Sequence, residues 1–250
     1  MRLGGSDRGV GVTQVRQALL LTTGLAQADS GDGAPRLAEL AGRTLLDHAL
    51  DRLAAAGVAS VTVAADGHAG VVAKHLAARV NGPNATLWPG ARSPGTANGW
   101  LGAVETLEDT PLFVVDGEAF WLDGPVPALT RLATAWDPGA SDATLLVART
   151  FGVHAEVGAG DFAMDPWGVL RRRREREIVP YLYAGVQVTD RRLFAPASAT
   201  AGMADLWRVA LDARRLYGVV HDGLWCPVAT PADLDDAEAV LQSQALGWSR

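Results

Sequence analysis

The first candidate for chemistry is a glycine-rich loop near the start of the chain. It follows the apolar segment Gln17–Thr22 and contains Gly24, Gly31 and Gly33, with Arg36 as its only cation. Backbone N–H groups that follow a strand in an α/β protein can cradle nucleotide phosphates, and glycine lets the backbone approach them closely. The loop is therefore a candidate phosphate site. The other interpretation is that Gly24 simply ends the strand.

A pair of acidic residues is the second candidate. Asp116 and Glu118 lie in "VVDGE", directly after the apolar segment Pro111–Val115. Carboxylates at the carboxyl end of a buried strand can hold Mg²⁺, because that ion prefers hard oxygen ligands. Both residues can also be ordinary solvated loop residues, but two acids at such a position favour a role in a site.

Other kinds of chemistry find little support in the sequence. Lys74 is the only lysine and lies in a predicted amphipathic helix, so the sequence lacks a G-x-x-x-x-G-K-[ST] phosphate loop and a Schiff-base lysine is not expected. His154 and His221 have no Cys or His partner at zinc spacing. The run "RRRRERE" at 171–177 is interpreted as an exposed strand of solvated charges, because glutamates interrupt the arginines.

Composition limits the partners and the compartment. The chain has 250 residues, 48% of them hydrophobic, and a formal net charge of −6, which argues against general binding to nucleic acid or to an anionic membrane. Cys226 is the only cysteine, so a reducing cytoplasm is expected. No apolar run approaches the roughly 18 residues that span a bilayer. Residues 1–16 are polar and glycine-rich and are predicted to form a flexible tail.

The elements that must position the two loops alternate between strand and helix. The helix over 44–57 is predicted to begin at Thr44, where Asp47 completes a capping box. Further strands are predicted at 60–65, 85–88 and 111–115, and further helices at 69–80, 97–107 and 128–136. This alternation predicts a doubly wound, mainly parallel α/β sheet, in which ligands bind beyond the carboxyl ends of the strands. Strand-like segments, among them 216–225, follow one another after residue 141, so the second half is expected to be more antiparallel. The last helix is predicted to begin at Thr230, where Asp233 completes a second capping box.

Four segments, in this order, carry a resemblance to a known family. They read "LAELAGRTLLDHALDRLAAAGV", "PLFVVDGEAFWLDGP", "YLYAGVQVTDRRLF" and "RLYGVVHDGLWCPVATPADLDDAEAVL". Over residues 17–241 the chain resembles the bacterial sugar-1-phosphate nucleotidyltransferases, especially the N-acetylmuramate-1-phosphate uridylyltransferase and mannose-1-phosphate guanylyltransferase type. The resemblance implies a Rossmann-like, GT-A-like fold in one domain over residues 17–245. It also implies a reaction in which a sugar phosphate attacks the α-phosphorus of a nucleoside triphosphate and pyrophosphate leaves.

The resemblance also implies which residues form the site. The nucleotide is expected to contact Thr22, Gly24, Leu25, Thr96, Gly99 and Asp116. The sugar is expected to contact Gly160, Asp161, Tyr183 and Gly185. Arg36 and Glu118 take the catalytic positions. In an active protein, Mg²⁺ would be held by Glu118 together with Asp116 or Asp222; Asp222 lies five residues before the family's second metal position, and the spacing does not require it.

The first loop departs from the family pattern A-A-G-x-G-T-R. Ala26, Gln27 and Ala28 stand where the family has Gly, Thr and Arg. The methyl group of Ala26 occupies a position where backbone should approach phosphate, and the positive charge at position 28 is lost. A phosphate-binding lysine of the family falls on Pro35, or on Arg36 if one residue is deleted.

The two metal positions depart as well. Glu118 replaces the first aspartate of the family, and Pro227 replaces the second. The resemblance therefore predicts a nucleotidyltransferase with impaired catalysis. A second hypothesis is a binding module without catalysis, which holds a nucleotide, a nucleotide-sugar or a partner protein in the same pocket. A third is a purely structural relic.

Overall fold

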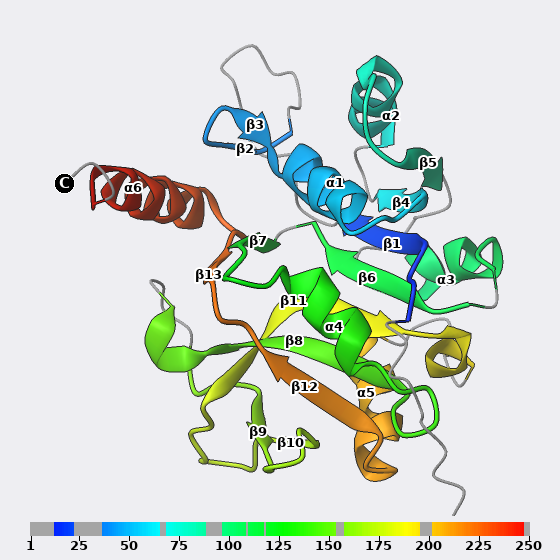
Figure 1. Ribbon diagram of the computed structural model, residues 1–250, viewed down its shortest axis with the longest axis vertical. Coiled ribbons are helices and arrows are strands. Elements are labelled where there is room, and N and C mark those ends of the chain that lie inside the picture. Colours follow the sequence, from blue (N-terminus) through cyan, green and yellow to red (C-terminus); the bar gives the residue numbers. More distant parts are fainter. Residues whose placement is uncertain are drawn as a thin grey trace, which may run out of the picture.

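The computed structural model describes residues 13–22, 37–65, 69–88, 97–108, 110–117, 119–153, 158–195 and 202–247. Its centre is a twisted sheet to which nine of the strands in these ranges belong. Helices cover both faces of this sheet (Figure 1). The predicted Rossmann-like α/β architecture is therefore confirmed.

The first half of the sheet is parallel. Strand β1 (Gln17–Thr22) lies between β4 (Ser60–Ala65) and β6 (Leu112–Asp116), and β5 (Asn84–Trp88) lies beyond β4. All of these pairs are parallel. Because their carboxyl ends meet at one edge, β1 and β6 end side by side.

The second half of the sheet is mixed, as the sequence predicts. The long strand β11 (Tyr181–Thr189) runs antiparallel to both β6 and β8 (Ala143–Arg149). Strand β12 (Leu216–Val220) pairs in parallel with β8. The hairpin of β9 (Phe162–Met164) and β10 (Leu170–Arg172) extends from the start of β11.

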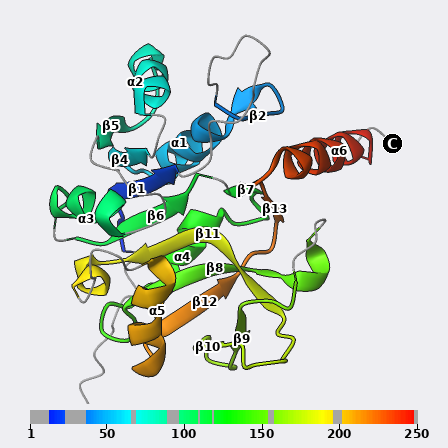
Figure 2. The same ribbon diagram turned by 180° about the vertical axis from the view of Figure 1, so that it is seen from behind.

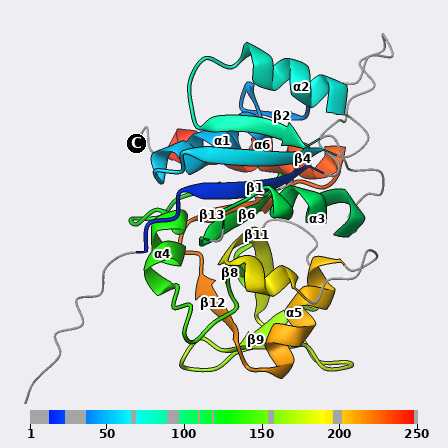
Figure 3. The same ribbon diagram turned by 90° about the vertical axis from the view of Figure 1, so that its right-hand side faces the viewer.

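Helices form a layer on each side of the sheet. Helices α1 (Leu45–Ala55) and α4 (Ala128–Ala135) cover one face, and α3 (Ala97–Glu105) and α5 (Met203–Asp212) cover the other (Figures 2 and 3). Successive side chains of a buried strand point to opposite faces of the sheet and so pack in both cores. Leu20 packs in the core beneath α1 and α4, and its neighbour Leu19 packs in the core beneath α3 and α5.

The remaining elements are short or peripheral. They are β2 (Glu39–Leu40), β3 (Arg43–Thr44), α2 (Ala69–Ala78), β7 (Ala119–Leu122), the 3₁₀ turns η1 (Thr150–Gly152) and η2 (Arg191–Phe194), β13 (Leu224–Pro227) and α6 (Pro231–Gly247). Strands β7 and β13 form a small antiparallel ribbon of their own.

The predicted helix starts are confirmed by their caps. Thr44 Oγ1 accepts a hydrogen bond from Asp47 N at 3.0 Å. At α6, Asp233 N donates to Thr230 Oγ1 at 3.2 Å, and the Asp233 carboxylate accepts from Thr230 N at 2.8 Å. Each cap satisfies backbone donors that the first helical turn leaves without a partner.

Two local predictions were wrong. The segment 171–177 is a strand only as far as Arg172, because a turn follows and Arg171 binds both carboxylate oxygens of Glu177 across it, at 2.7 and 2.8 Å. The segment 216–225, predicted as one strand-like run, is split into β12 and β13 by residues 221–223.

Within the described ranges, no helix combines the length and the apolar character needed to cross a membrane.

Candidate functional site

The carboxyl edge of the parallel strands brings Asp116 next to the end of β1. Asp116 is the last residue of β6 and is the register partner of Leu21. Gly117 N donates to Leu21 O at 2.7 Å, which fixes the start of the loop after β6. Thr22 ends β1, and its buried hydroxyl donates to Ala64 O at 3.3 Å. Thr22 therefore joins two strands at the edge where its nucleotide contact is predicted.

A bulge in β11 places Gly185 against the same edge. The register between β11 and β8 shifts between Tyr183 and Gln187, and Gly185 has a φ of +79°. A Cβ atom at Gly185 would lie 2.4 Å from Ala119 Cβ and 3.2 Å from Asp116 Cβ. Only glycine permits this backbone conformation and this close approach, so the bulge fixes β11 against the acidic loop.

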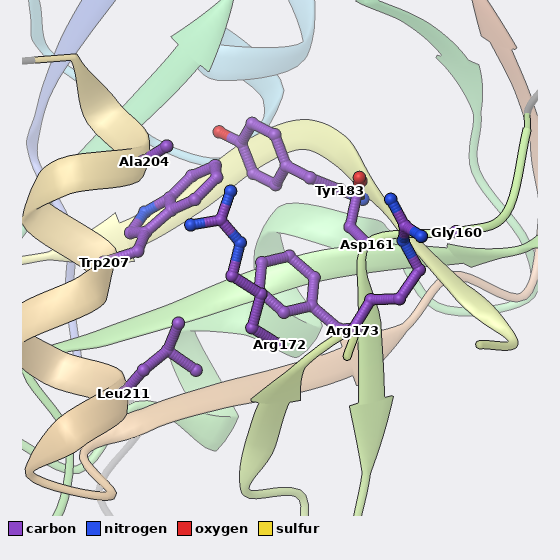
Figure 4. A pocket seen from close by; sticks show the side chains of 9 residues that line it. Gly160, Asp161, Arg172, Arg173, Tyr183, Ala204, Trp207 and Leu211 are labelled. Carbon is purple, nitrogen blue, oxygen red and sulfur yellow. Dashed lines mark hydrogen bonds between the residues drawn. The ribbon is translucent and has the colours of Figure 1, made fainter. Parts of the chain in front are cut away.

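A cavity of about 300 Å³ opens between β9, β10, β11 and α5. Figure 4 shows the side chains that line it. The lining residues are Gly160, Asp161, Phe162, Arg172, Arg173, Tyr183, Ala204, Trp207 and Leu211. The structure thus brings together three of the four residues that the sequence assigns to the sugar, while the fourth, Gly185, lies in the adjoining bulge.

One wall of the cavity is aromatic. The rings of Tyr183 and Trp207 meet edge to face with centroids 4.6 Å apart, and Phe162 lies 6.0 Å from Trp207. Trp207 Nε1 donates to Gln187 Oε1 at 2.7 Å, and Gln187 is fully buried. This hydrogen bond fixes the orientation of the indole ring, so the wall is held in a set position.

Gly160 and Asp161 form the floor where β9 begins. Gly160 has a φ of +79°, and a Cβ atom there would lie 2.1 Å from Val179 O. Asp161 accepts a hydrogen bond from Tyr183 N at 2.9 Å through its carboxylate and donates its own N–H to Tyr181 O at 2.8 Å. Asp161 therefore holds the start of β11 in place.

Tyr183 links the cavity electrostatically to the acidic edge. Burial, and next the negative charge of Asp116, raise the pKa of the Tyr183 phenol well above its ordinary value. The phenol is therefore neutral at physiological pH and keeps its proton for hydrogen bonding.

Arg172 and Arg173 line the cavity, although the sequence predicts only solvated charges on an exposed strand for this segment. Both side chains are exposed and line the cavity. The sequence predicts a strand that runs to Glu177, but β10 ends at Arg172. The alternation of side chains between the two faces of a strand therefore does not hold beyond Arg172. Ala204, Trp207 and Leu211 were also missed, although their spacing of three and four residues places them on one face of α5.

Several predicted residues fall outside the described ranges. They are Gly24, Leu25, Arg36, Thr96 and Glu118. Gly99 lies in the first turn of α3, which follows β5 and therefore starts at the carboxyl edge. The roles assigned to all of these residues stay predictions.

The described residues do not by themselves make up a metal site. Strand β13 pairs with β7 so that Pro227 lies opposite Ala119, and proline offers no side-chain ligand. Asp222 lies 2.8 Å from the guanidinium of Arg131 on α4, so a cation already neutralises it. No group of three or more metal-ligating side chains occurs in the part of the chain that the structure describes.

The fold is that of known nucleotidyltransferases. A UDP-glucose pyrophosphorylase solved in complex with UDP-glucose superposes with a TM-score of 0.74 at 9% identity, covering 92% of this chain and 99% of that one. An inositol-1-phosphate CTP transferase from T. maritima superposes with a TM-score of 0.66 at 15% identity, covering 91% and 96%. At these identities the likeness defines the class of fold.

The sequence defines the family within that class. No protein-family model matches the chain. However, an N-acetylmuramate alpha-1-phosphate uridylyltransferase from Caulobacter vibrioides is 32% identical over 236 residues, which cover 90% of this chain and 96% of the relative. The chain therefore belongs to the sugar-1-phosphate nucleotidyltransferase family, as the four sequence segments predict.

Proposed function

We propose that this protein binds UDP-N-acetylmuramate at the carboxyl edge and in the adjoining cavity, and that it forms this nucleotide-sugar from UTP and N-acetylmuramate 1-phosphate only slowly. The observation that carries the proposal is the pairing of Pro227 with Ala119. By the family resemblance, Pro227 stands at one of the two positions of the metal carboxylates, where proline offers no side-chain ligand.

Retained geometry supports binding. The cavity has room for a sugar, and its aromatic wall is held by the Trp207–Gln187 hydrogen bond. Gly160 and Gly185 keep backbone approaches that any side chain would block. Aromatic rings beside a few placed polar groups are typical of small-molecule sites. The sugar and the base are taken from the Caulobacter relative.

Lost charges support slow catalysis. Nucleotidyl transfer depends on positioning and on neutralising the phosphates, because the protein forms no bond itself. The chain has Ala28 in place of the loop arginine and Pro227 in place of a metal ligand, and its only lysine, Lys74, is exposed on α2. Each lost contact of this kind commonly costs about 10²–10³ in rate.

A binding module without any catalysis is the second candidate. The cavity beside α5 and the missing charges at the carboxyl edge both favour it, because a module of this kind needs a binding cavity but no catalytic residues. It would hold the nucleotide-sugar, or a partner protein that uses the pocket, without turning over.

Two measurements on the same preparation test the proposal. Pyrophosphate release from UTP and N-acetylmuramate 1-phosphate should be at least about a hundredfold slower than for the Caulobacter relative under identical conditions. UDP-N-acetylmuramate at a hundred times its dissociation constant should stabilise the fold by about 2.7 kcal/mol, which a melting shift detects. Slow release with binding supports the proposal, and complete absence of release with binding supports the module. No melting shift at millimolar ligand contradicts both and favours a structural relic.

A further inference from the structure

A second cavity, of about 150 Å³, lies where β8 and β12 end. Ala148 and Trp225 of its lining pack in the core beneath α1 and α4. Phe162 and Trp207, which line the cavity beside α5, pack instead in the core beneath α3 and α5. The sheet therefore separates the two cavities, and the second one is not part of the site proposed for the nucleotide-sugar.

Two aromatic rings in the wall of the second cavity each carry a polar nitrogen without a partner. His221 and Trp225 both line the cavity and are only 5% and 9% exposed. Within the described ranges, neither His221 Nδ1 nor Trp225 Nε1 forms a hydrogen bond, and both atoms are buried. Most buried polar groups in proteins have a partner, because leaving them unpaired is unfavourable. Two such nitrogens in one wall indicate a ligand that supplies the missing partners.

The surroundings of His221 define which partner each ring needs. His221 Nε2 lies 3.1 Å from Leu122 O and 3.1 Å from Leu224 O. Carbonyl oxygens only accept hydrogen bonds, so we assign the proton to Nε2, and Nδ1 of the neutral ring is then an acceptor that needs a donor. The indole N–H of Trp225 is a donor that needs an acceptor. The ligand must therefore both donate and accept.

The same cavity carries a cation whose charge is not offset. Asp222 lines the cavity but lies 2.8 Å from Arg131 on α4, so these two charges neutralise each other. Arg149 is exposed at the end of β8, and its guanidinium has no ion pair or hydrogen bond to any residue in the described ranges. The remaining positive charge favours an anion as the ligand.

We propose that the second cavity binds hydrogen phosphate, independently of the proposed function. An oxygen of the ion accepts from Trp225 Nε1, its remaining hydroxyl donates to His221 Nδ1, and the Arg149 guanidinium offsets its charge. Because both nitrogens are buried, binding requires the two rings to turn toward the ion. The cavity is about 150 Å³, against about 300 Å³ beside α5, so it suits a small ion and not a nucleotide-sugar.

The indole N–H signals in proton–nitrogen NMR spectra of the full chain test the proposal directly. Inorganic phosphate is titrated at constant ionic strength, and each indole signal is assigned through the backbone resonances of its own residue. Trp136 is the internal control, because its Nε1 is also buried without a partner in the described ranges and it does not line this cavity. We expect a saturable shift of the Trp225 signal at low-millimolar phosphate, with the Trp136 signal unchanged.

Two other anions define what the site recognises. Sulfate has a similar shape and charge but no O–H at neutral pH for His221 Nδ1. Its dissociation constant should therefore be at least about tenfold higher, as for the loss of one hydrogen bond to a charged group. UMP tests whether the site takes the phosphate of a nucleotide instead, and we expect no shift of the Trp225 signal because the nucleoside does not fit the cavity.

A pair of arginine variants tests the role of the charge. Arg149→Gln should raise the dissociation constant for phosphate by about tenfold or more. Arg208→Gln removes an equally exposed arginine of α5 that does not line the cavity, and it should leave phosphate binding unchanged. Both replacements are at exposed positions, so both variants should fold.

Four results would each overturn the proposal. They are a Trp225 signal that phosphate does not move, equal shifts of the Trp225 and Trp136 signals, equal affinities for phosphate and sulfate, and equal losses of binding in the two arginine variants. A response of Trp225 to UMP as strong as to phosphate would also overturn it, by assigning the site to a nucleotide. None of these results bears on the proposed function, which concerns the other face of the sheet.

Discussion

Pro227 lies directly across the β13–β7 ladder from Ala119, one residue beyond Glu118. These strands lie more than a hundred residues apart in the chain, and their pairing sets Pro227 opposite Ala119. Pro227 is the position at which the family resemblance places the second metal aspartate, and proline offers no side-chain ligand.

The first prediction concerns the bulge at Gly185. Gly185→Ala forces a left-handed backbone onto alanine and drives its Cβ to 2.4 Å from Ala119 Cβ, so it should destabilise the fold by about 2–5 kcal/mol. Gly57→Ala is the matched control, because Gly57 has a φ of +83° with nothing within 4 Å of its Cβ position. It should cost only the backbone strain, about 1–2 kcal/mol. Denaturant unfolding measures both, and equal costs would show that the approach to Ala119 does not constrain β11.

The second prediction concerns the hydrogen bond between Trp207 and Gln187. Trp207→Phe leaves the buried Gln187 Oε1 without its donor, which should cost about 1–3 kcal/mol. In a Gln187→Leu background the same change should cost clearly less, because no acceptor remains to be left unpaired. A double-mutant cycle in urea measures the coupling. A coupling energy near zero would mean that this bond does not hold the aromatic wall.

The third prediction concerns pH and Tyr183. Because burial and Asp116 raise the pKa of Tyr183 in the folded protein, the phenol loses its proton more readily when the chain unfolds. The stability linked to this proton is complete below about pH 10 and is lost as the pH rises above it, by up to about 1.4 kcal/mol per pH unit. Tyr183→Phe should therefore reduce the fall in unfolding free energy between pH 9 and 11. Parallel pH profiles for parent and variant would contradict the assignment.

Local sequence patterns predict much of this fold. The apolar run Gln17–Thr22 forms the central strand, and the pairing of Thr44 with Asp47 starts α1 where the capping pattern places it. Both features depend on residues that are close together in the chain, so a local sequence pattern is enough to predict them. The parallel order of the first half follows from the alternation of strands and helices.

The cavity depends on contacts that local patterns do not carry. Arg171 and Arg172 look alike in the sequence, and only the turn that joins Arg171 to Glu177 separates their environments. Trp207 reaches the cavity because α5 packs across the start of β11, a relationship between distant segments. The pairing of β13 with β7 is equally remote, so the sequence alone identifies Pro227 only through the family resemblance.

Restoring the missing groups tests the central claim most directly. The variant Ala26→Gly/Ala28→Arg/Glu118→Asp/Pro227→Asp returns the family residues at four positions, and replacing Pro227 by Asn in the same background is the matched control without the new charge. Groups that act on one transition state are not additive, so single changes should do little. Pro227→Asp also frees a backbone N–H, and unfolding measurements should show whether the variant stays folded.

The decisive measurement is Mg²⁺-dependent formation of UDP-N-acetylmuramate from UTP and N-acetylmuramate 1-phosphate. If the loss of charged side chains is what slows the reaction, the restored variant should form the product at least about tenfold faster than the parent. The rate of the asparagine control should fall well below that of the restored variant. Equal rates for parent, control and restored variant, with all three folded and binding UTP, would contradict the claim that charge loss at these positions is what slows the reaction.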